Sequence, residues 1–139
     1  MTQLLSSRGV DISQRNFQQV IIRGDGKDQF NQIINQEISV IPPSKNLEVT
    51  INDKFMFAKN SFDQWSLVYL VEQNYKEVLK FITNINSNDE ILASDYSYGQ
   101  VYFEISGKNR NEFLNKLTHF DLRLKKFPAF SMAQTLIAK

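Results

Sequence analysis

Hydrophobic residues recur at helical spacing between residues 74 and 85, and this is the clearest pattern in the chain. The apolar stripe consists of Tyr75, Val78, Leu79, Ile82 and Ile85. Lysine and glutamate side chains occupy positions between them. Apolar positions three and four residues apart are typical of a helix that packs one face against a core. The pattern therefore predicts an amphipathic helix over residues 74–85.

The rest of the chain contains short apolar runs of β character and two further helical patterns. Runs rich in valine, isoleucine and aromatic residues that end at glycine, proline, asparagine or aspartate are typical of strands. Strands are predicted over residues 17–23, 47–51, 55–59, 65–71, 90–94, 100–106 and 130–138, and further helices over residues 28–37 and 109–118. Strands grouped in hairpins between single helices indicate an α+β fold rather than a doubly wound parallel sheet.

The predicted strand over residues 100–106 has a regular alternation of side chains. Val101, Phe103 and Ile105 alternate with Tyr102 and Glu104. Because successive side chains of a strand point to opposite faces, the first set is expected to be buried and the second set to be wetter.

One arrangement of hydrophobic residues around a glycine occurs twice, 83 positions apart. Gly24 precedes Phe30 by six residues, and Gly107 precedes Phe113 by the same interval. A further apolar residue follows four positions later in both copies. Self-similarity at a fixed spacing indicates two related structural units.

The repeat predicts two intertwined, pseudo-symmetric β-α-β lobes after a polar leader at residues 1–16. The first lobe is expected over about residues 17–86 and the second over about residues 87–139. On this register Lys139 corresponds to Asp53, so the second lobe is expected to be incomplete. Its last strand would then lie at an unpaired edge, which predicts a partner surface or self-association through the C-terminal strand.

Composition and charge narrow the classes of function. The chain has 16 basic and 15 acidic residues, so no strong net charge attracts nucleic acid or an anionic membrane. The absence of cysteine excludes thiol chemistry and disulfides, and the single histidine, His119, excludes a histidine-rich metal site. No apolar run approaches the length of a membrane span or a signal core, so a cytoplasmic protein is expected.

The glycine-rich segment Arg23-Gly24-Asp25-Gly26-Lys27 lies between a predicted strand and a predicted helix. Such a position suits a phosphate cradle, but the segment lacks the third glycine of a dinucleotide fingerprint and the ending of a nucleotide-binding loop. We interpret it as a tight turn before a helix, with phosphate binding as the alternative.

Two other groups of residues are weaker candidates for a functional site. His119 with Asp121 and Ser131 could form an acid-base pair with a nucleophile, but no serine lies in a nucleophile-elbow context, and a histidine at a helix end explains the pattern better. A basic stretch with interleaved phenylalanines suggests a single-strand nucleic-acid surface, although helical spacing places Phe113 in the core. Its charged residues are Lys108, Arg110, Lys116, Arg123, Lys125 and Lys126.

Large amphipathic side chains near the turn at residues 95–99 form a candidate partner interface, because tyrosine and tryptophan are enriched at such interfaces. The alternative is that they fill the edge of the core. With the apolar residues of the C-terminal strand, the candidate interface comprises Trp65, Tyr96, Tyr98, Phe130, Met132 and Leu136.

Four segments spread over nearly the whole chain match the pattern of one protein family. They are Val20 to Gly24, Asp63 to Val68, Asp95 to Gly99, and Phe127-Pro128 with Ala133-Gln134-Thr135-Leu136-Ile137-Ala138. Together they resemble the gamma subunit of heterotetrameric bacterial sarcosine oxidase, whose fold is similar to the folate-binding domain of the glycine cleavage T-protein, the aminomethyltransferase. Family members usually continue past the last segment, so the resemblance is to a C-terminally shortened copy.

The resemblance implies a non-catalytic structural subunit of a complex that oxidises sarcosine to glycine and transfers the one-carbon unit to tetrahydrofolate. In that family the larger alpha and beta subunits hold FAD, FMN and NAD, and a delta subunit completes the complex. No cofactor and no catalytic residue is expected on this chain. The implied fold is the folate-binding-domain type of α+β fold, with the second lobe incomplete.

A second function remains open, in which the chain itself is a folate-binding or aminomethyltransferase-like module. Pterin recognition needs an acidic group and the glutamate tail of folate needs a basic one. The sequence offers Asp95 and Arg23 for these roles. Convergence of the two side chains on one pocket would favour this alternative.

Overall fold

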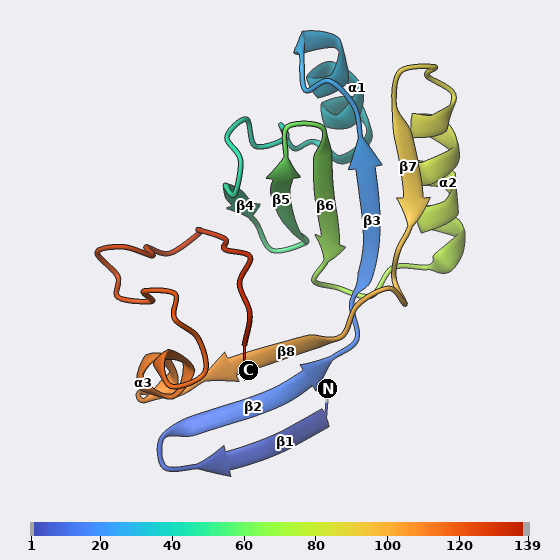
Figure 1. Ribbon diagram of the computed structural model, residues 1–139. Helices are drawn as coiled ribbons and strands as arrows, with labels where there is room; N and C mark the ends of the chain where they lie inside the picture. The colour runs from blue at the N-terminus through green and yellow to red at the C-terminus, as the bar shows by residue number, and fades with distance from the viewer. Residues whose placement is uncertain (1, 138–139) are drawn as a thin grey trace. The chain divides into compact units, whose positions relative to one another are not determined.

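The computed structural model describes residues 2–137, which form two compact units (Figure 1). Residues 17–99 form one unit, which we call the central unit. Residues 1–16 together with residues 100–139 form the other, which we call the terminal unit. This division differs from the expected lobes, because residues 87–99 belong with the first lobe and residues 1–16 belong with the second.

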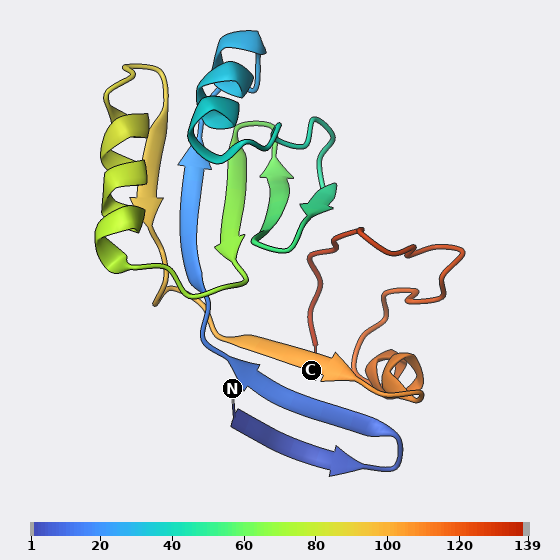
Figure 2. The same ribbon diagram turned by 180° about the vertical axis from the view of Figure 1, so that it is seen from behind.

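The central unit is a five-stranded antiparallel sheet with two helices over one face (Figure 2). The strand order is β4-β5-β6-β3-β7. The strands are β3 (Gln18–Arg23), β4 (Val49–Ile51), β5 (Phe55–Ser61), β6 (Gln64–Tyr69) and β7 (Leu92–Asp95), and the helices are α1 (Asp28–Ile38) and α2 (Tyr75–Asn86). The predicted strands and helices of this region are therefore confirmed, with shifts of a few residues at their ends.

The hydrophobic core lies between this sheet and the two helices. Alternate residues of β3, Val20 and Ile22, are fully buried, and so are Phe57 of β5 and Leu67 of β6. The helices contribute Phe30, Ile34, Val78, Phe81 and Ile85. Every residue of this core cluster belongs to the central unit.

The helix ends follow from local chemistry. The side chain of Asn74 accepts a hydrogen bond from the Lys76 backbone nitrogen at 3.0 Å and so caps α2. Ser39 caps the C-terminal end of α1: its backbone is left-handed, and its nitrogen donates to the Asn35 backbone oxygen. Before α1, Asp25 accepts from the Lys27 nitrogen at 2.9 Å. The glycine-rich segment is thus a turn before a helix, as interpreted from the sequence.

The two glycines of that turn serve different needs. Gly26 has φ +70, a conformation that other residues rarely adopt. Gly24 does not have a positive φ of this kind, but a Cβ added at Gly24 would lie 2.5 Å from the ring of Phe30. Gly24 therefore allows the Phe30 ring to approach the backbone.

The terminal unit is a three-stranded antiparallel sheet, in the order β1-β2-β8, with one short helix. Its elements are β1 (Thr2–Ser7), β2 (Val10–Arg15), β8 (Tyr102–Ser106) and α3 (Arg110–Asn115). The region expected as a polar leader thus forms a hairpin that pairs with β8, from Asp11 opposite Ser106 to Arg15 opposite Tyr102. The hairpin was missed because its side chains are nearly all exposed or half-buried, and its apolar alternation is limited to Val10 and Ile12.

Two predictions for the terminal unit are wrong. Val101 and Phe103 are exposed and Tyr102 is half-buried, so the buried face expected for β8 is absent. Residues 130–137 form no strand; they contain only an isolated bridge at Ser131, and residue 138 lies outside the described residues. Phe130 has φ 62, which an extended strand does not allow.

Candidate functional site

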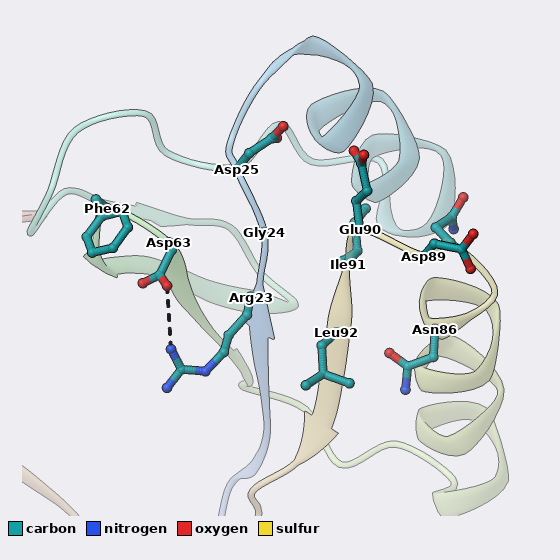
Figure 3. Close-up of a pocket in the computed structure, with 11 residues that line it drawn as sticks. Arg23, Gly24, Asp25, Phe62, Asp63, Asn86, Asp89, Glu90, Ile91 and Leu92 are labelled. Carbon is teal, nitrogen blue, oxygen red and sulfur yellow. Dashed lines mark ion pairs between the residues drawn. The ribbon is translucent and has the colours of Figure 1, made fainter.

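A cleft of about 820 Å³ opens in the central unit between the end of β3 with the turn before α1, the turn between β5 and β6, and the loop that joins α2 to β7 (Figure 3). Its lining residues are Arg23, Gly24, Asp25, Phe62, Asp63, Asn86, Asn88, Asp89, Glu90, Ile91 and Leu92. The Gly24 nitrogen donates to the Asp63 backbone oxygen at 3.1 Å, which joins the turn before α1 to the turn between β5 and β6. Exposed Phe62 and Leu92 give the cleft an apolar surface between its charged groups.

The charge of the cleft is negative. Arg23 lies 3.8 Å from the Asp63 carboxylate, and the other three lining carboxylates are Asp25, Asp89 and Glu90. Four carboxylates and one guanidinium line the cleft, so a phosphate group would meet net repulsion here. The geometry therefore does not support the phosphate alternative for the glycine-rich turn.

Arg23 and Asp95 do not converge. Arg23 is opposite Leu92 in the pairing of β3 with β7, whereas Asp95 is opposite Val20, three residues away. At about 3.3 Å per residue the two positions are about 10 Å apart along the strand, and their odd spacing directs the side chains to opposite faces of the sheet. Asp95 instead accepts hydrogen bonds from the nitrogen and hydroxyl of Ser97, at 3.0 and 2.7 Å.

The turn at residues 95–99 presents one tyrosine to solvent. The Tyr96 nitrogen donates to the Gln19 backbone oxygen at 2.8 Å, and the Ser97 hydroxyl accepts from the Gln19 nitrogen at 3.1 Å. These bonds fix the turn to β3. Tyr98 is 99% exposed and Tyr96 is partly exposed, so both remain candidates for a partner interface.

Trp65 is not a surface residue, which corrects its place in the candidate interface. It is 1% exposed, its ring centroid lies 4.5 Å from that of Phe30, and its Nε1 donates to the Pro43 backbone oxygen at 2.9 Å. The indole thus fills the core between β6 and α1. Its place on an inward position of β6, opposite Ile22, was the signal that favoured burial.

The C-terminal candidates lie on irregular backbone rather than on a strand edge. Phe130 and Leu136 are exposed and Met132 is half-buried. Exposure of large apolar side chains in this region therefore agrees with a partner surface, although the strand expected to carry them is absent.

The other chemical candidates stay apart or unsupported. The His119 side chain lies in a separate hollow with Thr118, Thr135 and Leu136. Asp121 is bonded to Arg123 by three hydrogen bonds between side chains, the shortest at 2.7 Å, and these bonds lower the pKa of the carboxyl to about 2. Among residues 2–137 no group of acidic and histidine side chains is arranged to hold a metal ion. No helix in this part of the chain is long and apolar enough to cross a membrane.

Comparison with solved structures identifies the fold. The chain superposes on one chain of the heterotetrameric sarcosine oxidase from Corynebacterium sp. U-96, solved in complex with pyrrole 2-carboxylate, with a TM-score of 0.81. The match covers 97% of this chain and 69% of that chain. The chain has the fold of a sarcosine oxidase subunit.

Sequence identity to the sarcosine oxidase chain is 15%, so the comparison establishes the shared fold. No family model and no curated protein matches the sequence. The resemblance to a sarcosine oxidase subunit that the four segments indicated is confirmed at this level, and so is the α+β class.

Proposed function

We propose that the chain is a non-catalytic structural subunit, of the gamma type, in a cytoplasmic sarcosine oxidase complex. Its partners in this proposal are the alpha and beta subunits, with delta, which would hold FAD, FMN and NAD. The complex would convert sarcosine to glycine and pass the one-carbon unit to tetrahydrofolate. The fold shared with a sarcosine oxidase chain supports membership, and the surface of the terminal unit supports a docking role.

The observation that carries the docking role is the uneven distribution of the core. In the described part of the terminal unit, Val10 is the only hydrophobic residue that is buried. The same unit exposes large apolar side chains at Leu4, Leu5, Val101, Phe103, Leu124, Phe130, Leu136 and Ile137. A small sheet without a packed face is only marginally stable in water, so a partner surface that covers these residues would stabilise the unit.

The test is co-expression of the chain with the alpha, beta and delta subunits from the same source. We expect the chain to co-elute with them, and a Phe130→Ser/Leu136→Ser variant to lower its share in the complex by about tenfold, or about 1.4 kcal/mol. Val71→Ser, a similarly exposed position in the central unit, is the matched control. Elution of the wild-type chain apart from the other subunits would contradict the proposal.

A second measurement separates a structural role from a catalytic one. If the chain is structural, the isolated chain binds no tetrahydrofolate and oxidises no sarcosine, while its removal from the complex lowers recovery of the assembled enzyme. Saturable binding of tetrahydrofolate to the chain alone, weakened by Asp95→Asn or Arg23→Gln, would instead favour the folate-binding function.

A further inference from the structure

The two units carry opposite formal charges. The central unit has 7 basic and 11 acidic residues, a charge of −4, and the terminal unit has 9 basic and 4 acidic residues, a charge of +5. The overall charge of +1 conceals this separation. Oppositely charged surfaces steer association and fix its register.

Three of the nine basic residues of the terminal unit, Arg123, Lys125 and Lys126, lie on one structured turn. The nitrogens of Lys126 and Phe127 donate to the Arg123 backbone oxygen at 2.9 and 2.7 Å, which closes a turn over residues 123–127. Phe120 and Phe127 pack edge to face at its base, with ring centroids 5.3 Å apart. We call residues 121–127 the basic turn.

The tip of the basic turn combines an exposed leucine with exposed lysines. Leu124 is 70% exposed, and the lysines that follow it, Lys125 and Lys126, are exposed and form no ion pair among the described residues. Because Phe120 and Phe127 are half-buried against each other, they are not free to stack on nucleic-acid bases. A leucine between cations is instead suited to a protein surface that is apolar at its centre and acidic around it.

The cleft of the central unit has this complementary character. Phe62, 76% exposed, and Leu92 supply the apolar surface. The lining carboxylates and Arg23 together carry a formal charge of −3. Arg23 already contacts Asp63, which leaves Asp89 and Glu90 as exposed acidic partners without an ion pair among the described residues.

We propose that the basic turn of one copy of this chain docks in the acidic cleft of a second copy. Leu124 would contact Phe62 and Leu92, while Lys125 and Lys126 would face Asp89 and Glu90. Each copy carries both surfaces, so the contact needs no other kind of chain. This self-association is measured on the chain alone and does not rest on the proposed role beside the alpha and beta subunits.

Charge reversal with mixing tests the proposal. A Lys125→Glu/Lys126→Glu chain and an Asp89→Lys/Glu90→Lys chain should each weaken self-association about tenfold or more, because each then opposes like charges. Mixed together, they should associate about as well as wild type, since the reversed turn of one chain complements the reversed cleft of the other, and the remaining turn and cleft are both native. Light scattering over a concentration series, at low and at high salt, gives the readout, with salt weakening the wild-type contact.

Circular dichroism checks that each variant folds. If the Lys125→Glu/Lys126→Glu chain does not fold, Lys125→Gln/Lys126→Gln removes the two positive charges of the turn without reversing them. A wild-type chain that stays monomeric over the whole series overturns the proposal, as does a mixture that fails to associate. The contact could instead form within one chain. In that case the protein stays monomeric, each reversal lowers the melting temperature, and a single chain that carries both reversals recovers the wild-type value. Binding of a single-stranded oligonucleotide by the basic turn, without self-association, would assign it to nucleic acid. Either result would also overturn the proposal.

Discussion

The side-chain amide of Asn86 donates to the Ala93 backbone oxygen at 2.9 Å and accepts from the Ala93 nitrogen at 2.6 Å. Ala93 lies on β7, the outer strand of the five-stranded sheet, and Asn86 is the last residue of α2. An outer strand presents unpaired backbone groups that can recruit another chain. Asn86 makes the two hydrogen bonds that a neighbouring strand would otherwise make, and so blocks the middle of this edge.

Replacing Asn86 by Ala should therefore destabilise the protein by about 1–3 kcal/mol, because it leaves a backbone donor and acceptor without partners. Urea unfolding measures the change. Asn84→Ala on the same helix is the matched control, since among the described residues its side-chain amide bonds only to the exposed Glu37 carboxylate, at 3.2 Å. Equal decreases in the free energy of unfolding for the two variants would show that the bonds to Ala93 contribute no more to stability than the bond to Glu37.

Trp65 is the single tryptophan, so its environment can be read directly from fluorescence. We expect blue-shifted emission that a soluble quencher hardly affects, because the indole is buried against Phe30. Trp65→Ala should cost about 3–5 kcal/mol, as other truncations of large aromatic core residues do. Tyr98→Ala should change stability by less than about 0.5 kcal/mol, as expected for an exposed position. Red-shifted, easily quenched emission would contradict this placement.

The phenylalanines of the two glycine-phenylalanine repeats are buried to different extents. Phe30 is buried, whereas Phe113 is only half-buried on the short helix α3. Phe30→Ala should therefore cost about 3–5 kcal/mol and Phe113→Ala only about 1 kcal/mol, in proportion to the apolar surface removed from water. Thermal unfolding of both variants tests this. A loss at Phe113 as large as that at Phe30 would indicate that the two helices are equivalent core elements.

Burial raises the pKa of Tyr69 from 10.0 to about 12. A group whose pKa is higher in the folded state contributes stability that is complete below its unfolded pKa and is lost as the pH rises through the folded value. Stability should thus fall between about pH 10 and 12. Absorbance titration of tyrosinate should show a late step, shared with Tyr102, whose pKa burial also raises to about 12.

Tyr69→Phe should remove part of this late step, and Tyr98→Phe should leave it unchanged. A late step of the same size in the Tyr69→Phe protein would show that this phenol titrates as an exposed group. Tyr69→Phe/Tyr102→Phe should abolish the step.

The sequence predicted the central unit well because its elements have strong periodic signals. The stripe along α2 and the apolar positions of β3 face the same core, so local pattern and burial agree. The family resemblance also depended partly on this region, at residues 20–24, 63–68 and 95–99.

The terminal unit was predicted less well for a physical reason. Its strands have little to bury, so the exposed Phe103 resembles a core residue in sequence although nothing in the unit covers it. Pairing of β1 with β2 depends on backbone hydrogen bonds, which leave no apolar pattern. The cleft was missed because its carboxylates come from three separate loops, and only the fold brings them together.

The pairing of Asp11 with Ser106 has a consequence for biosynthesis. All of residues 17–99 separate the two strands that meet there, and these residues form a continuous unit with its own core. On the ribosome, the central unit can fold as soon as β7 emerges, whereas β2 must wait for β8. We expect nascent chains stalled just after residue 99 has left the exit tunnel to protect the central unit from protease while residues 1–16 remain cleavable, so completion of the second sheet is the late event in maturation.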